Sequence, residues 1–335
     1  MIGYSGCIEG ILKVRKIANH NRTLSLIEEY CGNIDALESL FKILRSLPES
    51  VRIEAILICA KRILRTDLEA FWEIANMLYP SYWFVKLMCL SMRSLRLRWN
   101  SFYRAALSAI NAMKMGYRSI SYASLSESLV SIDRIETRKT LDRAINLLPF
   151  SYSSVVGGSA LIICRVLREL NLSTSRYLLA LANTVGGLRS LDPASKVDIL
   201  TRIVLAMQES GEEILNIIIG RIFGLIPKVD PMELVDLEIT VANMLATVFA
   251  DQEDKLLEMG SKYDSDEIRR IIKHAIMRIL RAKGEKLVLN MCSQDRGKLE
   301  IMEEVEKTLR RRAELRKKLA TKLSEILVKQ NFAFY

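Results

Sequence analysis

Apolar residues recur at intervals of three and four positions along nearly the whole of this 335-residue chain. The clearest example is one face of segment 268–280, which consists of Ile268, Ile271, Ile272, Ala275, Ile276, Ile279 and Leu280. Because an α-helix turns once in about 3.6 residues, this spacing places all of them on one side. No segment sustains the strict alternation of a half-buried strand, and Asn-Gly turn pairs are absent. The periodicity therefore predicts an all-α fold.

Proline is scarce, and its six residues mark places where helices are expected to end or begin. Four prolines follow apolar helical runs: Pro48, Pro80, Pro149 and Pro227. A proline lacks an N–H and has a fixed φ, so it stops a helix at these places. Two others follow an aspartate, in the pairs Asp192-Pro193 and Asp230-Pro231. That order is typical of an Asp N-cap with proline at the first helical position.

The prolines that end helices are spaced regularly. The intervals between them are 32, 69 and 78 residues, which correspond to one, two and two units of 32 to 39 residues. This is the length of one helix–turn–helix repeat. A local similarity between 75–82 (ANMLYPSY) and 144–152 (AINLLPFSY) supports the same period.

A small residue stands five places before two of these prolines, Ala75 before Pro80 and Ala144 before Pro149, and Trp72 precedes the first pair. Over about residues 30–250 the chain therefore resembles tetratricopeptide and HEAT-like α-solenoid repeat proteins. It departs from the tetratricopeptide pattern at Ile43 and Ile222, which replace the small residue, and it lacks the Trp and Gly signatures of the first helix. The resemblance implies stacked helix pairs and concerns architecture only. We expect a repeat-like array over 1–265 and basic C-terminal helices over 266–335.

The formal net charge of +10 is distributed unevenly. No acidic residue occurs from Ile74 to Ser126, a stretch that holds seven Lys and Arg, and residues 268–335 hold 18 basic and 8 acidic residues. Such patches favour anionic partners. The candidate contacts to an anion or nucleic acid are Arg93, Arg96, Arg98, Arg104, Arg270, Lys273, Arg281, Lys307, Arg310, Arg311, Arg312, Arg316, Lys317 and Lys318. The alternative is that both stretches are ordinary solvated helix faces.

The sequence offers no recognisable catalytic, cofactor-binding or metal-binding motif. It has two distant histidines and neither a phosphate-binding loop nor a dinucleotide fingerprint. The six cysteines are at least 20 residues apart, which predicts buried, reduced thiols in a cytoplasmic protein. The longest uncharged run, 144–164, contains Pro149 and four serines, so we do not expect it to span a membrane.

The sequence thus predicts a non-enzymatic helical scaffold that binds another protein and holds no cofactor. The alternative is a nucleic-acid-binding protein that uses basic helices within 268–329 and 86–118. An enzyme with a site assembled from distant residues ranks third. Binding of segment 268–281 to an anionic membrane surface is disfavoured, and the oligomeric state stays open.

Overall fold

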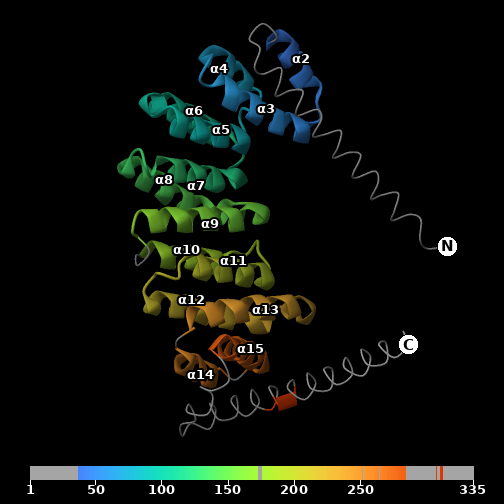
Figure 1. Ribbon diagram of the computed structural model, residues 1–335, viewed down its shortest axis with the longest axis vertical. Coiled ribbons are helices and arrows are strands. Elements are labelled where there is room, and N and C mark those ends of the chain that lie inside the picture. The colour runs from blue at the N-terminus through green and yellow to red at the C-terminus, as the bar shows by residue number, and fades with distance from the viewer. Residues whose placement is uncertain are drawn as a thin grey trace, which may run out of the picture. The chain divides into compact units, whose positions relative to one another are not determined.

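The computed structural model describes residues 37–172, 176–250, 252–263 and 265–283, together with residues 307, 310 and 311. Within these residues the chain forms fourteen α-helices and four short 3-10 helices, with no strand, which confirms the all-α prediction (Figure 1). The chain divides into two compact units, the first ending at Leu170 and the second beginning at Asn171. The boundary that the sequence predicts at 265/266 stays a prediction.

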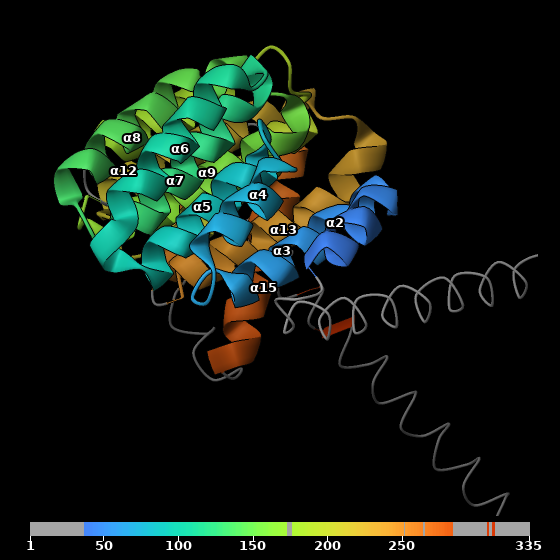
Figure 2. The ribbon, with the colours of Figure 1, turned by 90° about the horizontal axis from the view of Figure 1, so that it is seen from above.

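The first unit contains helices α2 to α9. Their bounds are α2 Leu37–Ser46, α3 Glu49–Ile63, α4 Leu68–Asn76, α5 Tyr82–Ser94, α6 Trp99–Ala112, α7 Arg118–Leu129, α8 Arg134–Leu147 and α9 Ser153–Glu169. Consecutive helices pack as the pairs α3/α4, α5/α6 and α7/α8. The first helix of each pair also packs against the first helix of the next, which gives the row α3, α5, α7 and α9 (Figure 1). Figure 2 looks along this row, so that its helices overlap.

The second unit contains helices α10 to α15. Their bounds are α10 Arg176–Gly187, α11 Pro193–Ala206, α12 Glu212–Leu225, α13 Pro231–Val248, α14 Glu253–Ser261 and α15 Asp266–Lys283. Here α11 pairs with α12 and α14 with α15, while α11, α13 and α15 form a row. Both units thus contain a row of alternate helices, but the pairing differs, because the row helix comes first in each pair of the first unit and second in the pair α14/α15.

Aspartate side chains cap several helices, as the sequence predicts for two of them. Asp192 and Asp230 accept hydrogen bonds from backbone N–H groups at the starts of α11 and α13, each with proline at the first helical position. Asp67 and Asp133 cap α4 and α8 in the same way. Helices also end or begin within a few residues of the other four prolines, which confirms that prediction.

The core of each unit is apolar. In the first unit the rings of Phe71 and Phe102 meet edge to face at a centroid distance of 5.8 Å, and both are buried. In the second unit, the isoleucine face that the periodicity predicts is buried at Ile268, Ile271, Ile272, Ala275, Ile276 and Ile279. Burial of such a face, rather than intrinsic propensity, supplies most of a helix's stability in a protein.

The described cysteines are Cys59, Cys89 and Cys164, and all three are buried. Cys89 and Cys164 are free thiols, as expected. Cys59 is disulfide-bonded, so the prediction of six reduced cysteines is wrong at this position. No helix in the described part of the chain is long and apolar enough to cross a membrane.

Candidate anion-binding pocket

The first unit contains a cavity of about 670 Å³ where two turns of the chain meet. One wall comes from the turn between α3 and α4, and the other from the end of α5 and the 3-10 helix η2, Arg96–Arg98. Four arginines line it, Arg65 from the first turn and Arg93, Arg96 and Arg98 from the second, and none of its described lining residues is acidic. We call this cavity the arginine pocket.

Local sequence explains the positions of these side chains. After α3 ends at Ile63, the Asp67 carboxylate accepts hydrogen bonds from the N–H groups of Glu69 and Ala70, which starts α4 at once and leaves a tight turn. After α5 ends at Ser94, Leu95 has a non-helical backbone conformation, so the chain changes direction into η2. Polar side chains in such turns point outward, because the apolar residues of the flanking helices occupy the core.

The arginine pocket carries positive charge that the described residues balance only in part. Arg93 donates a hydrogen bond of 3.0 Å to the backbone carbonyl of Glu127 and lies 3.8 Å from its carboxylate. That carboxylate also pairs with Arg165 at 3.1 Å, so one acidic group is shared by two guanidinium groups. Arg65, Arg96 and Arg98 are exposed and form no ion pair with any described residue.

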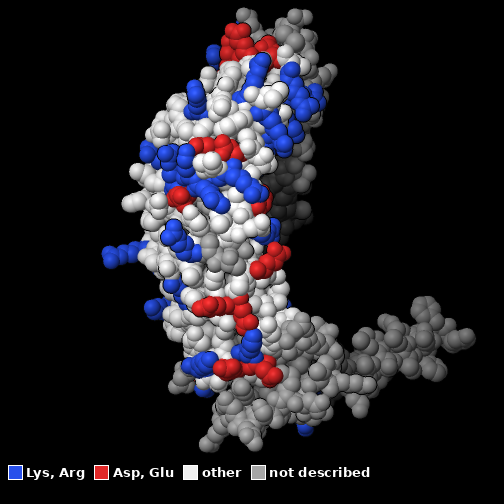
Figure 3. Space-filling model, turned by 90° about the vertical axis from the view of Figure 1, so that its left-hand side faces the viewer, with Lys and Arg blue, Asp and Glu red and all other residues white. Residues whose placement is uncertain are grey.

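This arrangement suits an anion with several oxygen atoms. A guanidinium group offers planar, paired N–H donors that match carboxylate and phosphate oxygens. Like charges held together without counter-charges raise the local concentration of anions, and salt screens the effect. Figure 3 shows many Lys and Arg side chains on one face of the first unit, with smaller groups of Asp and Glu side chains among them.

Of the four residues that the sequence proposed in this region, the structure brings three into one cavity. Arg93, Arg96 and Arg98 line the pocket, whereas Arg104 is exposed on α6 and does not. Arg65 was missed, because it lies outside the acid-free stretch and 28 positions before Arg93. Only the packing of α3 against α5 brings it to the pocket.

The candidate residues of the second unit are placed differently. Arg270 on α15 pairs with Glu238 on α13 at 3.0 Å, so its charge is balanced. Arg281 lines a smaller cavity of about 260 Å³ between α13 and α15, beside Arg278 and His274. Lys273 lies on the same helix. For these residues a role in anion binding stays a prediction.

Most of the C-terminal candidates lie outside the described residues. Lys307, Arg310 and Arg311 are described and are helical and exposed. The remaining four, Arg312, Arg316, Lys317 and Lys318, are not described. The arginine pocket is therefore the best-defined site of this kind.

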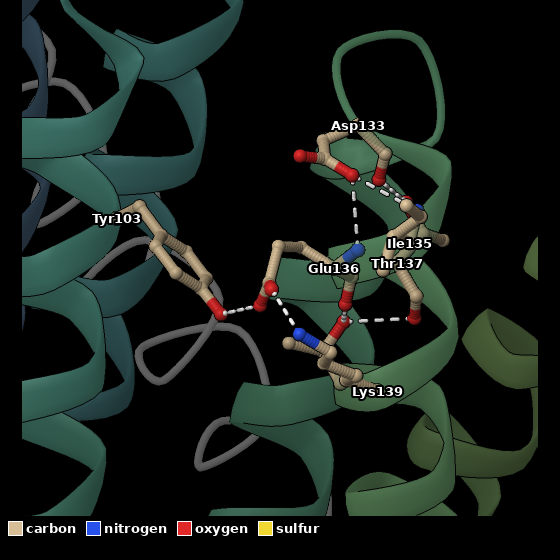
Figure 4. Close-up of polar contacts among 7 residues, drawn as sticks. Tyr103, Asp133, Ile135, Glu136, Thr137 and Lys139 are labelled. Atoms are coloured by element: carbon tan, nitrogen blue, oxygen red, sulfur yellow. Dashed lines mark hydrogen bonds and ion pairs between the residues drawn. The ribbon is translucent and has the colours of Figure 1, made fainter.

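A second polar cluster joins α6 to α8 (Figure 4). The Tyr103 hydroxyl donates to one carboxylate oxygen of Glu136 at 2.6 Å, and Lys139 Nζ donates to the other at 2.7 Å. These hydrogen bonds, that of Lys139 first, lower the pKa of Glu136, while burial and the carboxylate raise the pKa of Tyr103. Because both oxygens of Glu136 already accept hydrogen bonds, the cluster is suited to holding two helices together and not to proton transfer.

The described residues contain no group of three or more His, Cys, Asp and Glu side chains that could hold a metal ion. Comparison with models of known protein families found no match to the chain. Comparisons with curated proteins and with solved structures also found none.

Proposed function

We propose that this chain is a non-enzymatic helical scaffold that binds a nucleic acid, with the arginine pocket contacting its phosphates. The observation that carries the proposal is the convergence of four arginines on one cavity whose described lining residues include no carboxylate. Nucleic-acid affinity comes largely from such phosphate contacts. The sequence ranked a protein partner first, and we place a nucleic acid first because of the four arginines in this pocket.

The scaffold part of the proposal has support from the order of helix contacts. In the first unit, helices pack as consecutive pairs whose first helices form a row, and in the second unit α11, α13 and α15 form a row in the same way. This is the order expected of an α-solenoid-like array, the architecture that the proline spacing predicts. Arrays of this kind expose long surfaces along their helices, and they act through those surfaces.

Charge reversal in the pocket tests the proposal. The variant carries Arg65→Glu, Arg96→Glu and Arg98→Glu, which alters only exposed side chains. The control carries Arg189→Glu, Lys196→Glu and Lys228→Glu, which changes the net charge equally in the second unit. Circular dichroism checks that both variants keep the helical fold.

Binding of labelled single-stranded and duplex oligonucleotides is measured by fluorescence anisotropy over a range of salt concentrations. For the wild type, the logarithm of affinity should fall linearly with the logarithm of salt concentration. The pocket variant should bind single strands weakly, and the slope of its salt dependence should be shallower by about 2. The reason is that three arginines are replaced and each neutralised phosphate contributes about 0.7 on a single strand. The control should keep most of the affinity. Absence of salt-dependent binding by the wild type, or an equal loss in the control, would contradict the proposal.

A protein partner is the second candidate, and a stripe on α13 favours it. Met232, Val235 and Ile239 recur at intervals of three and four and are at least half exposed. Glu233 and Asp236 flank them and are also exposed, which suits a basic amphipathic helix. A photo-crosslinker at position 235 should then capture one defined protein that a crosslinker at position 189 does not. Loss of that product in the Met232→Ser, Ile239→Ser variant would assign it to the stripe.

A further inference from the structure

The turns that join successive helix pairs in the first unit all expose aromatic side chains. Tyr79 precedes α5, Tyr117 precedes α7, and Phe150 and Tyr152 precede α9. Between 40% and 63% of each of these side chains is exposed. Large aromatic residues are usually buried for their apolar area, so four exposed ones in equivalent turns require an explanation.

These turns lie beside one another. The N–H of Tyr152 donates to the carbonyl of Gly116 at 3.2 Å, and the rings of Tyr117 and Tyr152 meet at a centroid distance of 5.0 Å. The hydroxyl of Tyr79 lies 3.2 Å from that of Ser108, which is in the last turns of α6. The side chains of Tyr79, Tyr117, Phe150 and Tyr152 therefore belong to one side of the first unit, which we call the aromatic edge.

The surroundings of the aromatic edge are positively charged. No acidic residue occurs from 74 to 126 or from 143 to 168, the stretches that contain all three turns. Lys114 is exposed in the turn before α7, and the Lys86 ammonium lies 5.3 Å from the ring centroid of Trp83 at the start of α5. A ligand of this edge should thus offer both flat apolar groups and negative charge.

We propose that the aromatic edge stacks the bases of a single-stranded nucleic acid. The inference rests on the proposed function, because it names the form of nucleic acid that the scaffold takes. Every base has a π face, whereas the faces of bases within a duplex are covered by their neighbours. Exposed aromatic rings in a basic surface therefore select single strands without selecting a sequence.

The distance between the two surfaces sets a length requirement. Helix α5 begins beside Trp83 and ends at Ser94, which lines the arginine pocket. Its 13 residues span about 20 Å at about 1.5 Å per residue. A single strand must span this distance to contact both the arginine pocket and the aromatic edge. Affinity should therefore rise sharply once the oligonucleotide is long enough to reach both.

The test compares three variants with the wild type on single-stranded oligonucleotides of increasing length and on a duplex. Tyr117→Ala with Phe150→Ala removes two rings, and Tyr117→Leu with Phe150→Leu keeps apolar bulk but removes the flat faces. Ile135→Ala is the control, because Ile135 is also apolar and highly exposed but lies at the start of α8, away from these turns. Anisotropy and quenching of tryptophan fluorescence report binding.

The wild type should bind single strands more tightly than duplex. Both ring variants should lose roughly tenfold or more for single strands, with the salt slope and duplex binding unchanged, and Ile135→Ala should match the wild type. Equal affinity for single strands and duplex, or full affinity in the leucine variant, would overturn this inference. If the pocket variant still loses binding in that case, the proposed function remains intact. Preference for an acidic peptide such as polyglutamate over any oligonucleotide would overturn both.

Discussion

The hydroxyl of Tyr103 on α6 donates a hydrogen bond of 2.6 Å to the carboxylate of Glu136 on α8. The two helices belong to neighbouring pairs, so the bond joins one pair to the next. Glu136 lies in the first turn of α8. The N-cap residue Asp133 holds this turn by accepting a hydrogen bond from the backbone N–H of Glu136. The Tyr103 hydroxyl and the Glu136 carboxylate thus link α6 to α8.

Replacing Tyr103 with Phe should lower the free energy of unfolding by about 1 kcal/mol. The change removes one hydrogen bond to a charged group and keeps the ring packing. The net loss is small because the carboxylate can accept a hydrogen bond from water instead. Urea denaturation followed by circular dichroism measures the difference. An unchanged midpoint would show that the bond adds nothing to stability.

The pKa of Glu136 should rise toward its ordinary value in the Tyr103→Phe variant. The carboxylate has a lowered pKa because Lys139 and Tyr103 donate to it, and only the first donor remains in the variant. A lowered folded-state pKa means that the stabilisation is present above the unfolded-state pKa and is lost as pH falls through the folded-state pKa. NMR titration of the Glu136 carboxyl carbon measures the shift, and a curve identical to that of the wild type would contradict it.

Replacing Gly116 with Ala should destabilise the first unit by roughly 1–3 kcal/mol. A Cβ atom at this position would overlap ring carbons of Tyr152, so the aromatic ring must move. Gly224→Ala is the matched control, because nothing lies within 4 Å of a Cβ there and alanine favours the helix. Adding Tyr152→Ala should remove most of the penalty, and additive losses in that double variant would locate the strain elsewhere.

Replacing Asp133 with Ala should cost about 1 kcal/mol of stability, because the side chain caps α8. Its carboxylate accepts from the N–H groups of Ile135 at 2.9 Å and Glu136 at 3.0 Å. Asp133→Asn keeps an oxygen acceptor and should lose much less. Thermal denaturation of both variants measures the loss of stability. Equal losses in Asp133→Ala and Asp133→Asn would mean that the negative charge, and not the capping hydrogen bond, stabilises α8.

The thiols of Cys89 and Cys164 should react with a thiol reagent only after unfolding. Burial raises the pKa of each to about 12, so almost no thiolate exists in the folded protein near pH 8. Because the folded-state pKa is raised, the associated stability is present below the ordinary thiol pKa and declines as pH rises through the range from about 9 to about 12. Rapid labelling of either cysteine in native buffer, mapped by mass spectrometry, would show that these helices open readily.

Helix positions could be predicted from sequence because their signals are local. A proline after an aspartate fixes the start of α11 at Pro193 and of α13 at Pro231, and the isoleucine period identifies the buried face of α15. The arginine pocket could be predicted only in part. Arg96 and Arg98 stand out in an acid-free stretch, but no local pattern relates them to Arg65, since packing between helices determines that contact.

The aromatic edge could not be predicted for a different reason. An exposed ring and a buried ring look the same in sequence, and Phe102, which is buried, lies among the same aromatic residues as the half-exposed Trp99 and Tyr103. The similarity of segments 75–82 and 144–152 did contain a signal, because both segments prove to lead into the turns before α5 and α9. The tyrosine that both segments share is Tyr82 in one and Tyr152 in the other, at the starts of α5 and α9, whereas Tyr79 of the aromatic edge corresponds to Leu148.

The row of α3, α5, α7 and α9 has a consequence for how the first unit comes apart. Each row helix makes its main row contacts with the helix before and the helix after it, so no single central cluster holds the unit together. Cooperativity then depends on the strength of each interface between neighbours, and opening starts at an end of the row and proceeds pair by pair. Amide hydrogen exchange should accordingly be slowest in α5 and α7, whose interfaces on both sides must be lost before they open.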